Sequence, residues 1–122
     1  MILLVDTSVW VDHLSKADPL LADVLDNQGV CMHPMILGEL AMGTMRDRRE
    51  LISLDRLPKA EVASHVEVRY AVERYRLFGT GMSFIDAHLL VSTLITPDCF
   101  LHTRDKRLAV ASSDLQVLAV PL

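Results

Sequence analysis

Short runs of apolar residues alternate with longer helical patterns along this chain. Residues 2–5 are four apolar residues in a row rather than an alternating pattern, which is typical of a parallel strand covered on both faces. Further runs at 30–32, 99–102 and 117–120 predict three more short strands. Because strands alternate with helices, the pattern predicts an α/β sandwich in which helices flank a short central parallel sheet.

Capping residues and apolar stripes predict where the helices lie. Pro34, for example, suits the first position of a helix that follows a strand. The longest helical pattern covers 59–78, with Val62, Val66 and Tyr70 among the residues expected to be buried. The predicted helices are 8–14, 19–28, 35–45, a short one within 46–58, 59–78, 83–96 and 103–111.

Composition limits the classes of protein that fit this pattern. The 122 residues suit one compact domain over 1–122, and 51% hydrophobic residues are enough to bury a core. The longest stretch without a charged residue, 27–38, is much shorter than the roughly 20 apolar residues that cross a membrane. The first residues also lack the layout of a secretory signal, so we expect a cytoplasmic protein with no membrane partner.

Charge and cysteine content add two weaker limits. The net charge of -4 does not suit a surface that neutralises many phosphates, so a nucleic-acid ligand would need another source of positive charge. Cys31 and Cys99 lie in apolar segments without CxxC spacing. Buried free thiols are therefore the favoured interpretation, with a disulfide as the alternative.

Four acidic residues stand out by their positions. Asp6 follows the first strand directly and Asp105 follows the strand 99–102 closely, so both belong at the carboxyl ends of strands, where parallel sheets bind ligands. Glu39 and Asp86 are lone acids within apolar helical segments, where an unpartnered carboxylate is costly. Because such acids repel one another when close, a divalent cation such as Mg²⁺, or Mn²⁺ in its place, would resolve the conflict. That chemistry favours phosphodiester cleavage.

Each acid also has a purely structural interpretation. Asp6 and Asp105 could cap the helices that follow them, and Asp86 stands three residues after Ser83, as in a capping box. Glu39 could reach solvent or pair with an arginine. The hydroxyl residues beside these acids are also common caps, and their functional use would be to orient a carboxylate or a metal-bound water; they are Thr7, Ser8 and Thr103.

Other catalytic motifs are missing from the sequence. There is no GxSxG turn, P-loop or GxGxxG, and the five histidines do not have metal-ligand spacing. Two basic clusters lie a short distance along the chain from the acids, and they either guide a nucleic-acid backbone or form solvated helix faces. Their members are Arg46, Arg48 and Arg49, and Arg104, Lys106 and Arg107.

Four segments together resemble PIN-domain ribonucleases of the VapC toxin type. They are 4–10 (LVDTSVW), 36–40 (ILGEL), 81–90 (GMSFIDAHLL) and 102–105 (HTRD), and they extend over the whole chain in the family's order. The resemblance implies a PIN-like sandwich and an Mg²⁺-dependent endoribonuclease that a small antitoxin protein inhibits, commonly as a homodimer. It matches the family's acidic residues to Asp6, Glu39, Asp86 and Asp105. Of these four, the resemblance implies that Asp6, Asp86 and Asp105 bind the metal.

The pattern departs from the family at one point, because Lys106 rather than an aromatic residue follows Asp105. Two other interpretations stay open. A phosphatase of the haloacid dehalogenase type would use a nucleophilic Asp6, but Ser8 stands where its second Asp belongs. A non-enzymatic module would bind metal only to hold its shape or a partner. Metal-dependent RNA cleavage separates the ribonuclease from both.

Overall fold

The computed structural model describes residues 1–119 as three strands and seven helices. The strands are β1 (Ile2–Val5), β2 (Val30–Cys31) and β3 (Cys99–His102). The helices are α1 (Thr7–Ser15), α2 (Pro19–Asp26), α3 (Pro34–Met42), α4 (Glu50–Asp55), α5 (His65–Arg74), α6 (Phe84–Ile95) and α7 (Lys106–Asp114).

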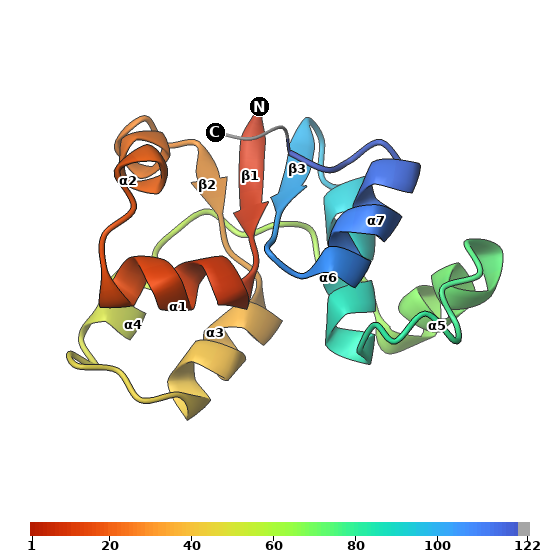
Figure 1. Ribbon diagram of the computed structural model, residues 1–122, viewed down its shortest axis with the longest axis horizontal. Coiled ribbons are helices and arrows are strands. Elements are labelled where there is room, and N and C mark those ends of the chain that lie inside the picture. The colour runs from red at the N-terminus through yellow and green to blue at the C-terminus, as the bar shows by residue number, and fades with distance from the viewer. Residues whose placement is uncertain (120–122) are drawn as a thin grey trace.

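The sheet is parallel, with the order β2-β1-β3. Leu4 of β1 lies opposite Cys31 of β2 on one side and Leu101 of β3 on the other. Helices α1 to α4 gather on the β2 side of the molecule and α5 to α7 on the β3 side (Figure 1). The predicted α/β sandwich around a short parallel sheet is confirmed.

The core forms where the sequence is most uniformly apolar. Leu3, Leu4 and Val5 of β1 are fully buried, as expected for a central strand with helices on both faces. Helix α6 is buried along most of its length, from Ala87 to Thr93, because it is apolar on nearly all sides. Both cysteines are buried and free, in agreement with the favoured interpretation.

The predicted helix over 59–78 is wrong at both ends. Residues 58–60 run alongside β2 instead, because the Met32 amide donates to the Pro58 carbonyl at 2.7 Å and the Ala60 amide to the Met32 carbonyl at 2.9 Å. Helix α5 begins only at His65, after a capping box in which the side chains of Ser64 and Glu67 satisfy each other's backbone amides.

The buried face predicted for this helix is also wrong. Val62, Val66 and Tyr70 are 53%, 66% and 71% exposed, and the residues of α5 that pack inward are Val68 and Ala71. The predicted apolar stripe joins Val66 and Tyr70 of α5 to Val62, which lies before the helix. Because Val62 lies in extended chain, its spacing from Val66 says nothing about a helix face.

The remaining boundary predictions need smaller corrections. Helix α3 ends at Met42 rather than 45, and α7 covers Lys106–Asp114 rather than 103–111. Of the strand predicted at 117–120, Leu118 makes an isolated parallel bridge with Leu101, and Val120 lies outside the described residues. Within 1–119, no helix is both long enough and apolar enough to span a bilayer.

Candidate active site at the strand ends

The sheet order places the carboxyl ends of β1 and β3 side by side at one edge of the sheet. The chain leaves β1 towards β2 on one side and returns through β3 on the other, so strand order reverses at this pair of strands. Ligands of open parallel sheets bind at such a point. Asp6 directly follows β1, and Asp105 follows β3 at the start of α7. The two acids thus lie on the same edge of the sheet.

Asp6 is held from several directions. It is only 6% exposed, and it caps α1 by accepting a hydrogen bond from the Thr7 amide at 2.7 Å. Its second oxygen accepts from Ser8 Oγ at 3.2 Å and from Thr103 Oγ1 at 2.7 Å. The structural interpretation of Asp6 as a helix cap is therefore correct, and the three donors also fix the orientation of its carboxylate.

Two of these residues, Thr7 and Thr103, also connect Asp6 to two other acids. Thr7 Oγ1 donates to Glu39 Oε1 at 2.7 Å, which joins the start of α1 to α3. Thr103 Oγ1 accepts from the Asp105 amide at 3.0 Å, and Asp105 in turn caps α7 through the Leu108 amide at 3.0 Å. Residues far apart in the sequence thus form one continuous polar network at this edge.

Asp86 lies in the first turn of α6. It forms the predicted capping box with Ser83, whose Oγ accepts from the Asp86 amide at 3.1 Å while Asp86 Oδ2 accepts from the Ser83 amide at 3.3 Å. Burial is the main cause that raises the pKa of Asp86, and the negative charges of Asp6 and Asp105 raise it further. The charges of Asp6 and Asp105 therefore reach Asp86 from the edge of the sheet.

No cationic side chain neutralises these acids. Among the ion pairs that residues 1–119 form, none includes Asp6, Glu39, Asp86 or Asp105. Within residues 1–119, no three His, Cys, Asp or Glu side chains lie close enough together to hold a metal ion by themselves. Mg²⁺ does not need such a cage, because it keeps several waters and takes one or two carboxylates directly. The all-oxygen donors and their uncompensated charge fit such an ion.

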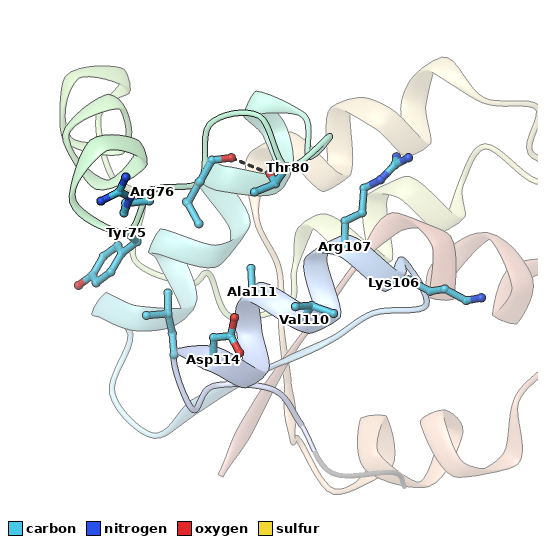
Figure 2. Close-up of a pocket in the computed structure, with 10 residues that line it drawn as sticks. Tyr75, Arg76, Thr80, Lys106, Arg107, Val110, Ala111 and Asp114 are labelled. Carbon is cyan, nitrogen blue, oxygen red and sulfur yellow. Dashed lines mark hydrogen bonds between the residues drawn. The ribbon is translucent and has the colours of Figure 1, made fainter.

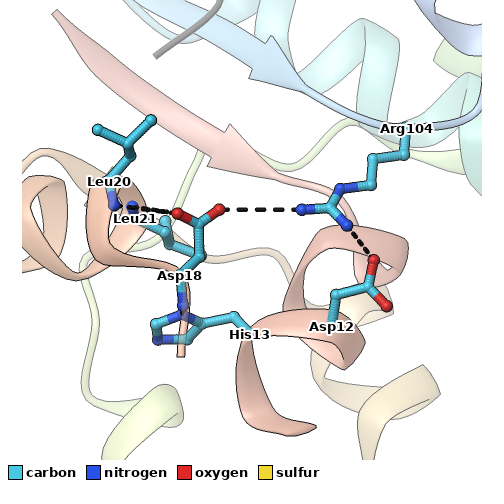
Figure 3. A network of polar contacts seen from close by, with 6 residues as sticks. All are labelled: Asp12, His13, Asp18, Leu20, Leu21 and Arg104. Atoms are coloured by element: carbon cyan, nitrogen blue, oxygen red, sulfur yellow. Dashed lines mark hydrogen bonds and ion pairs between the residues drawn. The ribbon is translucent and has the colours of Figure 1, made fainter. Parts of the chain in front are cut away.

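The predicted basic residues separate into two groups. Arg104 turns away from the acids towards α1 and α2, where it pairs with Asp12 and, at 3.8 Å, with Asp18 (Figure 3). Arg49 pairs with Asp47, and Arg48 donates to the Ala41 carbonyl. These three arginines are engaged within the protein.

The other three predicted basic residues, Arg46, Lys106 and Arg107, each line a cavity. Arg46 lines a hollow of about 360 Å³ together with Glu39. Lys106 and Arg107 line a larger cavity on the opposite side, at the start of α7.

Histidines form a cluster behind the site that sequence reasoning missed. His33 is buried and caps α3, since its Nδ1 accepts from the Met35 amide at 3.0 Å. Burial lowers the pKa of His33 to about 4, with a smaller contribution from His88. His88 is also buried, and its Nε2 lies 2.7 Å from Nδ1 of His65. The position of His33 between a strand and Pro34 was the available signal for a cap.

Comparison with known proteins finds a ribonuclease that is similar to this chain over most of its length. No protein-family model matches the chain. The chain is 40% identical over 113 residues to Ribonuclease VapC32 of Mycobacterium tuberculosis, from both strain CDC 1551 / Oshkosh and strain ATCC 25618 / H37Rv. The aligned region covers 92% of this chain and 91% of the relative.

Proposed function

Because the chain belongs to the VapC ribonuclease family, we propose that it is a metal-dependent endoribonuclease and the toxin of a type II toxin-antitoxin pair. The observation that supports the proposal is that Asp6 and Asp105 lie at one sheet edge, that Asp86 is near enough for both charges to act on it, and that no ion pair within residues 1–119 includes any of the three. A site of this charge repels an RNA phosphate unless a cation is present. The protein is therefore an RNA-cleaving enzyme only in its metal-bound form.

The residues of the site divide into holding and orienting roles. Asp6 and Asp86 hold Mg²⁺, with Asp105 in contact directly or through water, and Mn²⁺ is a possible substitute. When bound, the ion supplies an activated water and neutralises charge on the scissile phosphate. Glu39, which Thr7 holds by a 2.7 Å hydrogen bond, orients the attacking water. Thr103 and Ser8 keep the Asp6 carboxylate in position.

Cleavage of a labelled mixed-sequence RNA tests this function. Purified protein is assayed with Mg²⁺ and with EDTA, and an Asp6→Asn variant purified in the same way excludes a contaminating nuclease. We expect cleavage only by the unaltered protein with Mg²⁺. Equal cleavage by Asp6→Asn, or cleavage in EDTA, would contradict the metal site. A panel of structured tRNAs serves as a second substrate set for an enzyme with narrow specificity.

We propose that the cognate antitoxin inhibits the site with a basic side chain. An Arg or Lys placed among the three carboxylates would replace the charge of the metal, and Arg can bind a carboxylate through two hydrogen bonds. The toxin and its antitoxin act in the cytoplasm, which contains the RNA substrate. Inhibition that survives removal of every basic residue of the antitoxin would contradict this mechanism.

We also propose that the protein forms a homodimer through the exposed side of α5. Val66, Arg69, Tyr70 and Glu73 follow one another at helical spacing, and all four line a hollow beside Phe84. In a two-fold antiparallel contact, Arg69 of each copy would meet Glu73 of the other around the apolar centre. This self-complementary charge pattern favours a second copy as the occupant.

Analytical ultracentrifugation tests the dimer. Tyr70→Asp should convert the protein to a monomer, because a carboxylate would be buried at the centre of the contact. Ile52→Asp is the matched control, since Ile52 is 58% exposed on α4 and outside this surface. A Tyr70→Asp protein that sediments like the control would refute the α5 contact.

A further inference from the structure

A cavity of about 490 Å³ opens between α7 and the turn that follows α5 (Figure 2). It begins at Lys106 and Arg107, the two residues that directly follow Asp105. Tyr75 and Arg76 stand at its other end, and Val110 and Ala111 lie between (Figure 2). The cavity therefore extends along α7, away from Asp105.

The cations at the two ends of this cavity are free of partners. Arg76, Lys106 and Arg107 take part in none of the ion pairs or side-chain hydrogen bonds found within residues 1–119. This differs from Arg48, Arg49 and Arg104, which bind groups of the protein itself. The positive charge of the cavity is available to an anionic ligand, although the whole chain carries a net charge of -4.

The backbone is shaped to hold Arg107 at the cavity. Gly81 has φ of 87°, a left-handed conformation that glycine adopts without strain. A Cβ at Gly81 would lie 2.8 Å from Nε of Arg107 and 3.0 Å from its Cδ, so a larger residue there would make the Arg107 side chain shift. The missing side chain thus lets the Arg107 side chain lie against the backbone of this turn.

The floor between the two charged ends is apolar. Val110 is 61% exposed there, and Tyr75 is 39% exposed, with the Arg74 guanidinium 5.4 Å from its ring centre. A flat ligand with apolar faces could stack beside Tyr75 while anionic groups at its two sides meet the cations. A nucleotide within a single-stranded RNA has this combination of a base and flanking phosphates.

We propose that this cavity binds a nucleotide of the RNA strand outside the scissile bond. The inference rests on the proposed ribonuclease function, and it assigns a binding role to Tyr75, Arg76 and Arg107 beyond the acids. One flanking phosphate meets Arg107, two residues after Asp105, and the other meets Arg76. Asp114, which also lines the cavity, repels phosphates and accepts hydrogen bonds from donor groups of the base, so it fixes which part of the nucleotide lies at that point.

Steady-state cleavage and RNA binding together test this proposal. Binding of a fluorescein-labelled single-stranded RNA is followed by anisotropy in EDTA, and KM and kcat are measured with Mg²⁺. We expect Arg107→Ala and Arg76→Ala to weaken binding and raise KM about fivefold to tenfold, with kcat within about twofold. Each should also reduce the slope of log Kd against log salt by about 0.7.

Tyr75 supplies a test that does not depend on charge. Tyr75→Ala should weaken binding about tenfold without changing the salt slope, and Tyr75→Phe should restore it, because stacking requires only the ring. Arg56→Ala is the matched control for charge, since Arg56 is exposed at the end of α4, a helix on the β2 side of the molecule, and lies outside the cavity. We expect this control to bind and cleave RNA like the unaltered protein.

The outcomes separate the two proposals. If the unaltered protein cleaves RNA and the cavity variants match Arg56→Ala, the cavity proposal is overturned and the ribonuclease stands. If the unaltered protein neither binds nor cleaves any RNA, both proposals fail. Variants that bind RNA normally but lose inhibition by the antitoxin would show that the cavity docks a protein, which also overturns the RNA assignment.

Discussion

Arg104 and Asp105 are neighbours in the chain, yet they belong to two regions of opposite electrostatic design. Arg104 reaches towards α1 and α2, where it neutralises Asp12 and Asp18 (Figure 3). Asp105 lies at the strand ends, where its charge and that of Asp6 both act on Asp86. One region is a paired network that holds helices together, and the other is a set of like charges left without a cation.

The difference shows how a functional site can be distinguished from surface charge. Asp12 is 55% exposed and has a partner, so its charge costs the fold little. Asp6 is 6% exposed and has only hydroxyl and amide donors, which orient its carboxylate without removing its charge. Charge that a fold keeps buried and uncompensated indicates a ligand that brings the opposite sign.

The largest expected effect is on catalysis. Asp86→Asn should lower kcat about 10³-fold or more, because it removes a charge that holds the metal, worth several kcal/mol in the transition state. Asp12→Asn, in the paired network, should change kcat by less than about threefold. Single-turnover cleavage of one RNA measures both variants. Equal losses in the two variants would erase the distinction between the regions.

The buried and uncharged His33 extends the comparison to stability. Its pKa is about 4 in the folded protein, against an ordinary value of 6.5, so unfolded chains bind protons first as the pH falls. The stability that neutral His33 contributes is complete above pH 6.5 and is lost as the pH falls towards 4. At about 1.4 kcal/mol per pKa unit, the loss is about 3 kcal/mol.

Urea unfolding at pH 7 and pH 4.5 measures this loss. The variant His33→Asn keeps an acceptor at the start of α3 but has no group that titrates in this range. Its stability should therefore vary less between the two pH values than that of the unaltered protein. An unchanged pH dependence in the variant would show that His33 is not the group responsible.

A smaller effect is expected from the metal. Mg²⁺ at ten times its dissociation constant should stabilise the protein by about 1.4 kcal/mol, which raises Tm by about 4 °C. Asp6→Asn should abolish this shift, whereas Asp18→Asn should keep it, because Asn can still cap α2. Thermal unfolding with and without EDTA is the measurement. A Tm that does not respond to millimolar Mg²⁺ would contradict the cation site.

The smallest expected effect is on the free energy of unfolding without metal, which should change in opposite directions in two variants. The pKa of Asp86 is raised in the folded protein, so its charged form at pH 7 opposes folding. Asp86→Asn should slightly stabilise the metal-free protein, and Asp12→Asn should destabilise it by about 0.5 kcal/mol through the lost ion pair. Urea unfolding in EDTA measures both. Two changes of the same sign would contradict the contrast between the regions.

Several elements were predictable from local patterns alone. The uniform apolar run of β1, the capping box of Ser83 and Asp86, and the proline at the start of α3 each act within a few residues. Helix α5 was not predictable in this way. The segment before it pairs with Met32, the residue that follows β2. The backbone hydrogen bonds of this pairing join Met32 to Pro58 and Ala60, about 26 positions away in the chain.

The sequence alone determined which residues could carry chemistry and which class of fold would bring them together. Apolar runs and strand-end acids are local properties, and they were sufficient to single out Asp6, Glu39, Asp86 and Asp105 as candidates, whose catalytic roles stay a prediction. Only the tertiary structure decided which charges are neutralised, because pairing depends on distances between segments remote in the chain. Arg104 and Arg107 look alike in the sequence, and the packing of α1 and α2 against one and of Gly81 against the other gives them different roles.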